Sequence, residues 1–168
     1  QQRRQYVRQQ RERGGLVQGG LPHGHTYLRL QDMPYTILAS ASFMEPWLRR
    51  FIQRPLQKGS PATIIGQGTF RHSLIAMQDA AAFATAMIDH QDAINKTVAI
   101  GGPEALSWLE VVARVEAMIG QDIPVRHYRP GERLPGLSEQ TSRIAVNFET
   151  FDYVVDMADT TERFGVPL

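Results

Sequence analysis

The chain has 168 residues, of which 42% are hydrophobic and 21% are charged, and its formal net charge is +1. This length and composition predict one folded domain with a hydrophobic core and exclude a wholly disordered chain. The absence of cysteine excludes disulfides and thiolate metal sites and agrees with a cytoplasmic location. No apolar run approaches the ~18 residues of a membrane helix, and the polar first residues do not resemble a signal peptide. We therefore expect no membrane association.

The first 30 residues differ from the rest in charge. They hold six arginines and one acid, Glu12, whereas the remaining residues hold twelve bases and sixteen acids. One interpretation is a basic arm for nucleic acid. However, Tyr6 is the one aromatic residue in 1–26, so no stacking platform for bases accompanies the arginines. We expect residues 1–26 to be a disordered or unrelated segment, residues 27–168 to form a single domain, and nucleic acid not to be a partner.

The first half of the domain predicts strands separated by a helix. Residues 33–43 are nearly continuously apolar and β-rich, as in a strand of a parallel sheet buried on both faces. Residues 45–57 place large apolar side chains at helical spacing, and Pro55 is expected to end or kink that helix. Residues 62–65 predict a short strand, followed by a Gly66-Gln67-Gly68 turn, and residues 70–77 predict another strand.

The second half continues the alternation. Asp79 is expected to cap a helix to about His90, and 97–100 predicts a strand. Ser107-Trp108-Leu109-Glu110 has the pattern of a capping box, which predicts a helix ending at Gly120. The remaining expected elements are a strand at 123–127, a loop at 129–141 and a last helix at 147–157, packed through Phe148, Phe151, Val154 and Val155.

This alternation is typical of an α/β fold, and three blocks add a family resemblance. Residues 33–47 read MPYTILASASFMEPW and resemble a late sheet strand of NmrA-like proteins, which are atypical short-chain dehydrogenase/reductases. Residues 66–81, from Gly-Gln-Gly to Met-Gln-Asp-Ala-Ala, resemble the family's next strand-to-helix joint. Residues 101–125, which begin Gly-Gly-Pro-Glu-Ala-Leu-Ser, are similar to the segment after its last long parallel strand. The resemblance covers roughly residues 27–168.

The resemblance implies an incomplete Rossmann-like sheet, made of late parallel strands plus C-terminal substrate-side elements. The family's N-terminal βαβ units, whose glycine-rich turn grips NAD(P), have no counterpart before residue 27. No cofactor-binding residue is therefore assigned, and we expect the chain alone to bind NAD(P) poorly. A sheet that lacks its first strands exposes an edge, which predicts a homo-oligomer or a second chain covering the sheet.

The resemblance also indicates where a small-molecule ligand would bind. Ligands of open α/β sheets bind at the carboxyl ends of the strands, and in the family the region beside the Gly-x-Gly turn borders the substrate cleft. The candidate substrate-binding residues are Ser40, Ser42, Phe43, Met44, Trp47, His72 and Ser73. Core packing is the alternative role for the large apolar members. The chain lacks the family's usual Tyr-x-x-x-Lys pair, so no catalytic residue is assigned.

Residues 14–25, GGLVQGGLPHGH, offer a different chemistry. They match neither a phosphate loop nor a dinucleotide fingerprint, because Gly20 replaces the required lysine and no apolar strand precedes them. His23 and His25 have the spacing of a metal-ligand pair in an extended chain. A divalent metal there could activate water for hydrolysis of an ester or lactone.

Three functional hypotheses follow from the sequence. The first is a small-molecule-binding domain related to NAD(P)-dependent NmrA-like reductases. The second is a metal-assisted hydrolase that uses His23 and His25. The third is a non-catalytic interaction protein that pairs through its sheet edge.

Overall fold

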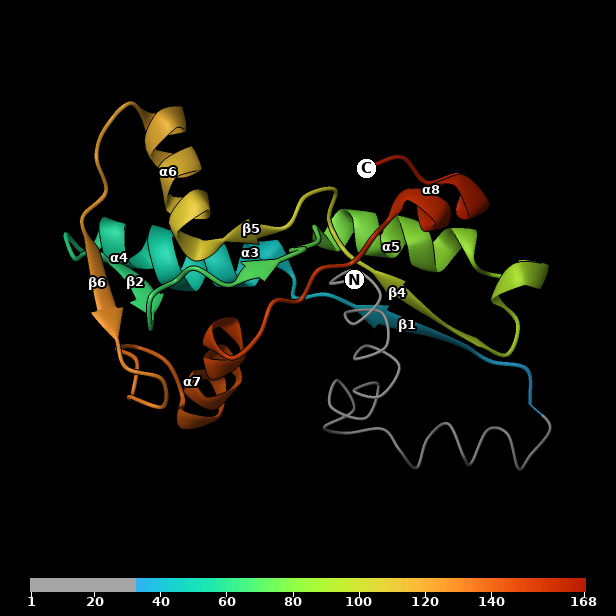
Figure 1. Ribbon diagram of the computed structural model, residues 1–168, viewed down its shortest axis with the longest axis horizontal. Helices are drawn as coiled ribbons and strands as arrows, with labels where there is room; N and C mark the ends of the chain where they lie inside the picture. The colour runs from blue at the N-terminus through green and yellow to red at the C-terminus, as the bar shows by residue number, and fades with distance from the viewer. Residues whose placement is uncertain (1–32) are drawn as a thin grey trace, which may run out of the picture.

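The computed structural model describes residues 33–168, which form two lobes that lie side by side (Figure 1). Within these residues, no helix has the length and apolar character required to cross a membrane. The helices and strands follow the chain in the order β1 (Thr36–Ser40), α3 (Met44–Leu48), η1 (Arg49–Gln53), α4 (Arg54–Gln57), β2 (Ala62–Ile65), β3 (Arg71–His72), α5 (Met77–Ala86), η2 (Gln91–Ala93), β4 (Lys96–Ile100), β5 (Leu106–Ser107), α6 (Trp108–Ile119), β6 (Val125–Tyr128), α7 (Glu139–Ala145), η3 (Val146–Glu149) and α8 (Ala158–Phe164).

The strands form pairs, and two of the pairs are parallel. β1 pairs with β4 in a register that runs from Thr36 opposite Lys96 to Ser40 opposite Ile100. β2 pairs in parallel with β6, and the very short strands β3 and β5 pair antiparallel. Parallel strands joined through helices confirm the predicted α/β class. The strands expected within 33–43, at 62–65 and at 97–100 are present.

The β2–β6 lobe contains those two strands, the helical run 44–57, α6 and α7. Its core is an aromatic cluster in which the Phe148 ring lies 4.9 Å from Trp47, 6.0 Å from Phe51 and 5.4 Å from Trp108, centroid to centroid. All four side chains are buried. These edge-to-face contacts join Phe148, late in the chain, to the helical run 44–57 and to α6.

The β1–β4 lobe is built on the other parallel pair, with α5 and α8 packed beside it. Ile75, Phe83 and Ile100 are fully buried there, and Met157 and Phe164 complete the contact from the end of the chain. Each lobe therefore has its own hydrophobic cluster.

The helical run 44–57 ends two residues after Pro55. Proline lacks the N–H that would continue the α-helical ladder. The chain adopts a π-helical segment just before it, and the Arg54 N–H donates to the Arg49 carbonyl, five residues back. This wider turn lets the helix continue to Gln57 before it stops.

Two expectations at the start of α5 are wrong. Only Arg71 and His72 of the expected strand 70–77 form a strand, and Ile75 adds an isolated bridge to Phe43. The helix then begins at Met77 and is not capped by Asp79. Both carboxylate oxygens of Glu45 accept from the Met77 N–H instead, at 3.0 and 3.2 Å. A glutamate 32 residues away in sequence takes the place of a local cap.

The predicted last helix at 147–157 is also wrong. Helix α7 begins inside the predicted loop, and residues 151–157 form an extended strap that precedes α8. The Tyr153 N–H donates to the Arg71 carbonyl at 2.8 Å, and the Tyr153 carbonyl accepts from the Ser73 N–H at 2.9 Å. These bonds to Arg71 and Ser73 give the backbone N–H and carbonyl groups of Tyr153 hydrogen-bond partners without a helix. In contrast, the capping box of α6 is formed as predicted, and Gly120 ends that helix with a φ of 70°.

Candidate functional site

The candidate site lies where the chain passes between the two lobes. The crossing segments are 41–44, 73–76, 101–105 and 151–157, which come from distant parts of the sequence (Figure 1). The carboxyl ends of β1 and β4, at Ser40 and Ile100, open onto this junction. This is the end of a parallel pair at which open α/β folds bind ligands.

Backbone hydrogen bonds bring together the two sequence regions that were predicted to share a site. The Ile75 N–H donates to the Ser42 carbonyl at 3.1 Å, and the Met44 N–H donates to the Ile75 carbonyl at 2.9 Å. Segments 40–47 and 71–75 therefore lie alongside one another. Ser42 and Met44 are half-buried and Phe43 is 37% exposed, so these side chains have partial access to solvent. Ser40, at the end of β1, is half-buried as well.

The other predicted ligand residues point into the protein. His72 is buried, and its Nε2–H donates to the Phe148 carbonyl at 3.2 Å. Burial lowers the pKa of His72 below its usual value of 6.5, because the cation would be poorly solvated. Ser73 is also buried, and its Oγ accepts from the Val155 N–H at 3.1 Å. With Trp47 in the aromatic core, these three side chains already have packing or hydrogen-bonding partners.

Gly101 and Gly102 serve the close approach of backbones at the junction. A Cβ atom at Gly102 would lie 2.0 Å from the Leu74 carbonyl oxygen, and one at Gly101 would lie 2.8 Å from the Ser73 Cβ. The Gly102 N–H donates to the Ser73 carbonyl at 3.2 Å. The space beside Gly102 is therefore occupied by backbone atoms, and the space beside Gly101 by the Cβ atoms of Ser73 and Val155.

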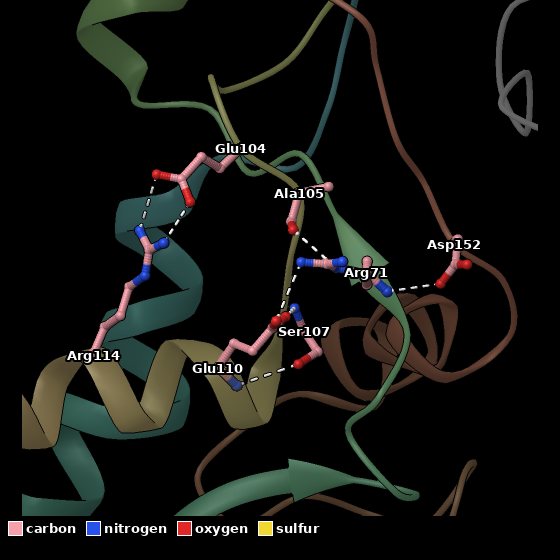
Figure 2. Close-up of polar contacts among 7 residues, drawn as sticks. All are labelled: Arg71, Glu104, Ala105, Ser107, Glu110, Arg114 and Asp152. Atoms are coloured by element: carbon pink, nitrogen blue, oxygen red, sulfur yellow. Dashed lines mark hydrogen bonds and ion pairs between the residues drawn. The ribbon is translucent and has the colours of Figure 1, made fainter.

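Arg71 is the charged residue that ties the junction to α6 (Figure 2). Its Nε donates to the Ala105 carbonyl at 3.1 Å, and its Nη2 donates to Glu110 Oε1 at 3.2 Å. Its backbone N–H donates to Asp152 Oδ1 at 2.8 Å. The sequence did not single out Arg71 or Asp152, because neither belongs to a local motif.

Glu110 has two roles at once. Its Oε2 accepts from the Ser107 N–H at 2.8 Å in the capping box, while Oε1 pairs with Arg71. The hydrogen bonds from Ser107, followed by the charges of Arg71 and Arg114, lower the pKa of Glu110. Glu110 is thus the point where the predicted helix cap meets the junction. On the next turns of α6, Arg114 pairs with Glu104.

The N-terminus of a helix binds phosphate groups through its free N–H groups. At the starts of three described helices, one backbone N–H group already has an acceptor within the protein. The Glu45 carboxylate accepts from the Met77 N–H at the start of α5. The Glu110 carboxylate accepts from the Ser107 N–H just before α6. The Ser138 hydroxyl accepts from the Thr141 N–H at the start of α7.

A metal site finds no support in the described part of the chain. Residues 33–168 contain no group of three or more histidine and acidic side chains placed to hold a metal ion. His23 and His25 lie outside the described residues.

Comparisons with solved structures place this fold among Rossmann-like proteins. UDP-glucuronic acid 4-epimerase from Bacillus cereus, in complex with NAD and a sugar nucleotide, is similar with a TM-score of 0.64 and 18% identity over 85% of this chain. NADPH-dependent quinone oxidoreductase from Escherichia coli is similar with a TM-score of 0.67 and 18% identity over 84% of this chain. An isoflavone reductase is similar with a TM-score of 0.61 and 18% identity over 82% of this chain. No family model matches the chain. No curated protein sequence matches the chain either.

The likeness covers only part of these neighbours. The chain spans 43% of the epimerase, 52% of the quinone oxidoreductase and 50% of the isoflavone reductase. At this identity the comparison shows the fold, which agrees with the predicted Rossmann-like class.

Proposed function

We propose that this chain is the small-molecule-binding part of an NmrA-like, NAD(P)-dependent reductase, and that it does not hold the dinucleotide by itself. The observation that carries the proposal is its likeness to structures of reductases and epimerases that contain NAD or NADPH, over about half of their length. The carboxylates that already occupy the starts of α5 and α6 support the second half of the proposal.

We place the small-molecule site on the exposed side of the junction, at Ser40, Ser42, Phe43 and Met44. These residues lie at or just after the carboxyl end of β1 and have partial solvent access. The buried residues His72 and Ser73 belong to the segment 71–75 that hydrogen-bonds to them through its backbone. Their mixture of hydroxyl groups with an aromatic ring and a thioether suits a ligand with both polar and apolar parts.

Two measurements test this proposal. Titration of 15N-labelled protein with fragment-sized aromatic carbonyl compounds should shift the amide resonances of residues 40–44 and 73–75. Calorimetry with NADPH should give no dissociation constant tighter than about 100 μM, a free energy of roughly −5.5 kcal/mol. Tight NADPH binding, or fragment shifts confined to other surfaces, would contradict the proposal.

A second candidate is pairing through a sheet edge. Within residues 33–168, β1 hydrogen-bonds to β4 alone and β2 to β6 alone. Two-stranded parallel pairs have unpaired backbone groups that attract another strand. We therefore propose a homo-oligomer or a second chain as partner. Light scattering should give a mass above the 18.9 kDa of one chain; a monomer at all concentrations would exclude self-association.

A further inference from the structure

Three arginines of one helical run gather around a surface groove beside the start of α5. The groove has a volume of about 270 Å³ and is lined by Glu45, Pro46, Arg49, Arg50, Arg54 and Met77. Arg49 and Arg50 lie one helical turn before Arg54, and Glu45 lies one turn earlier still. We call this feature the arginine groove.

The positive charge of the arginine groove is not balanced within the described structure. Elsewhere in residues 33–168, Arg71 pairs with Glu110 and Arg114 with Glu104. The guanidinium groups of Arg49, Arg50 and Arg54 have no such carboxylate partner among these residues. Gathering like charges in one groove is unfavourable unless an anion offsets them.

Glu45 is the one acidic residue lining the groove, and its carboxylate is already engaged. Both of its oxygens accept from the Met77 N–H at the start of α5. Its negative charge is therefore directed at the helix terminus. Three guanidinium groups and one carboxylate leave the groove with a positive excess.

One of the three arginines is held in place by the core. The Arg50 Cζ lies 5.5 Å from the centroid of the Trp47 ring, a cation–π distance. Trp47 is itself fixed by edge and tilted contacts with Phe148 and Phe51. Restraining Arg50 in this way reduces the entropy lost when it binds an anion.

We propose that the arginine groove binds a phosphate-bearing small molecule, a phosphate ester or a diphosphate. The planar guanidinium fork matches two phosphate oxygens at once, which a lysine ammonium does not. A volume of about 270 Å³ suits a phosphate group with a few further atoms. This proposal does not depend on the ligand of the junction or on the function proposed above.

The test uses inorganic pyrophosphate as the probe and 15N-labelled full chain at constant ionic strength. We expect saturable shifts of the amides of residues 45–54 and Met77, with a dissociation constant of about 1 mM, typical of a few surface charge contacts. The double substitution Arg49→Gln with Arg54→Gln should weaken binding at least about tenfold. Removing the same charge by Arg114→Gln with Arg143→Gln, on α6 and α7, should change it less than about twofold.

Three results would overturn the proposal. The first is the absence of saturable shifts up to about 10 mM pyrophosphate, ten times the expected constant. The second is an equal loss of affinity in the two double variants, which would mean general screening of charge. The third is tighter binding of a single-stranded oligonucleotide at the same residues, which would assign the groove to nucleic acid. Circular dichroism of each variant verifies folding, and shifts at 45–54 distinguish this site from the junction at 40–44.

Discussion

The carboxylate of Glu149 lies directly over Gly66, in the turn that follows β2. Its Oε1 accepts from the Gln67 N–H at 2.7 Å, and its Oε2 accepts from the Gly68 N–H at 3.1 Å. A Cβ atom at Gly66 would lie 2.2 Å from the Glu149 Cγ. The turn thus binds an anion that the protein itself supplies, and this contact fixes η3 beside β2.

Gly66→Ala should therefore destabilise the protein by about 2–4 kcal/mol. The φ of 56° at Gly66 costs an alanine about 1 kcal/mol, and the methyl group must also displace Glu149 from two charge-assisted hydrogen bonds. Urea unfolding measures the change. Gly59→Ala is the matched control, because Gly59 has a similar φ of 66° and no atom within 4 Å of the added carbon.

A double-mutant cycle separates these two costs. In a Glu149→Ala background, Gly66→Ala should cost only about 1 kcal/mol, since no side chain remains to be displaced. Equal costs in both backgrounds would show that the added methyl group does not displace Glu149.

Glu45→Ala should destabilise the protein by about 1 kcal/mol, the usual effect of losing an N-terminal cap. The reason is that Glu45 accepts the Met77 N–H, which has no other acceptor at the start of α5 among the described side chains. Asp79→Ala is the comparison, because Asp79 makes no cap and contributes only through the helix dipole, about 0.5 kcal/mol. Chemical denaturation of both variants would detect the difference. A larger loss for Asp79→Ala would contradict the assignment of Glu45 as the cap.

Acidification should destabilise the protein through His72. Burial lowers the pKa of His72 in the folded state below 6.5, so below about pH 6.5 the unfolded chain takes up a proton that the folded chain does not. The free energy of unfolding should be unaffected by this group above that pH. It should then fall toward lower pH with a limiting slope of about 1.4 kcal/mol per pH unit.

The variant His72→Gln isolates this effect, because an amide N–H can still donate to the Phe148 carbonyl. Urea midpoints at pH 7.5, 6.5 and 5.5 should show a smaller acid loss for His72→Gln than for the unmodified protein. The same loss in both proteins would assign the pH dependence to other groups.

The elements that the sequence predicted correctly are those set by neighbouring residues. The capping box of Ser107 and Glu110 needs only a four-residue pattern, and the strand at 62–65 needs only a short apolar run. The helix expected at 147–157 failed because the acceptor and donor groups that hold residue 153 extended belong to Arg71 and Ser73, about eighty residues earlier. No pattern within 147–157 reports those partners.

The same distinction applies to the candidate site. The rule that ligands bind at the carboxyl ends of parallel strands indicated residues 40–44, and the family resemblance indicated residues 71–73 beside the same cleft. The sequence could not predict that His72 and Ser73 would turn inward, since that depends on Phe148 and Val155 from the last part of the chain. The role of Arg71 was equally hidden, because its partners Glu110 and Asp152 are far from it in sequence.

Gly102→Ala should damage the junction more than a change in an exposed turn. An added methyl group at residue 102 would overlap the Leu74 carbonyl oxygen, which is backbone and cannot rotate away. The two crossing segments would have to separate, at a cost of about 2–4 kcal/mol for overpacking and the lost bond from the Gly102 N–H to Ser73. We expect a lower urea midpoint together with shifted amide resonances at 73–75 and 101–103.

The control is Gly131→Ala, because no atom lies within 4 Å of the carbon that it adds. This variant should cost only about 1 kcal/mol from the φ of 86° at Gly131 and leave the resonances of the junction in place. If both variants lose stability equally, close backbone contact does not hold the two lobes together.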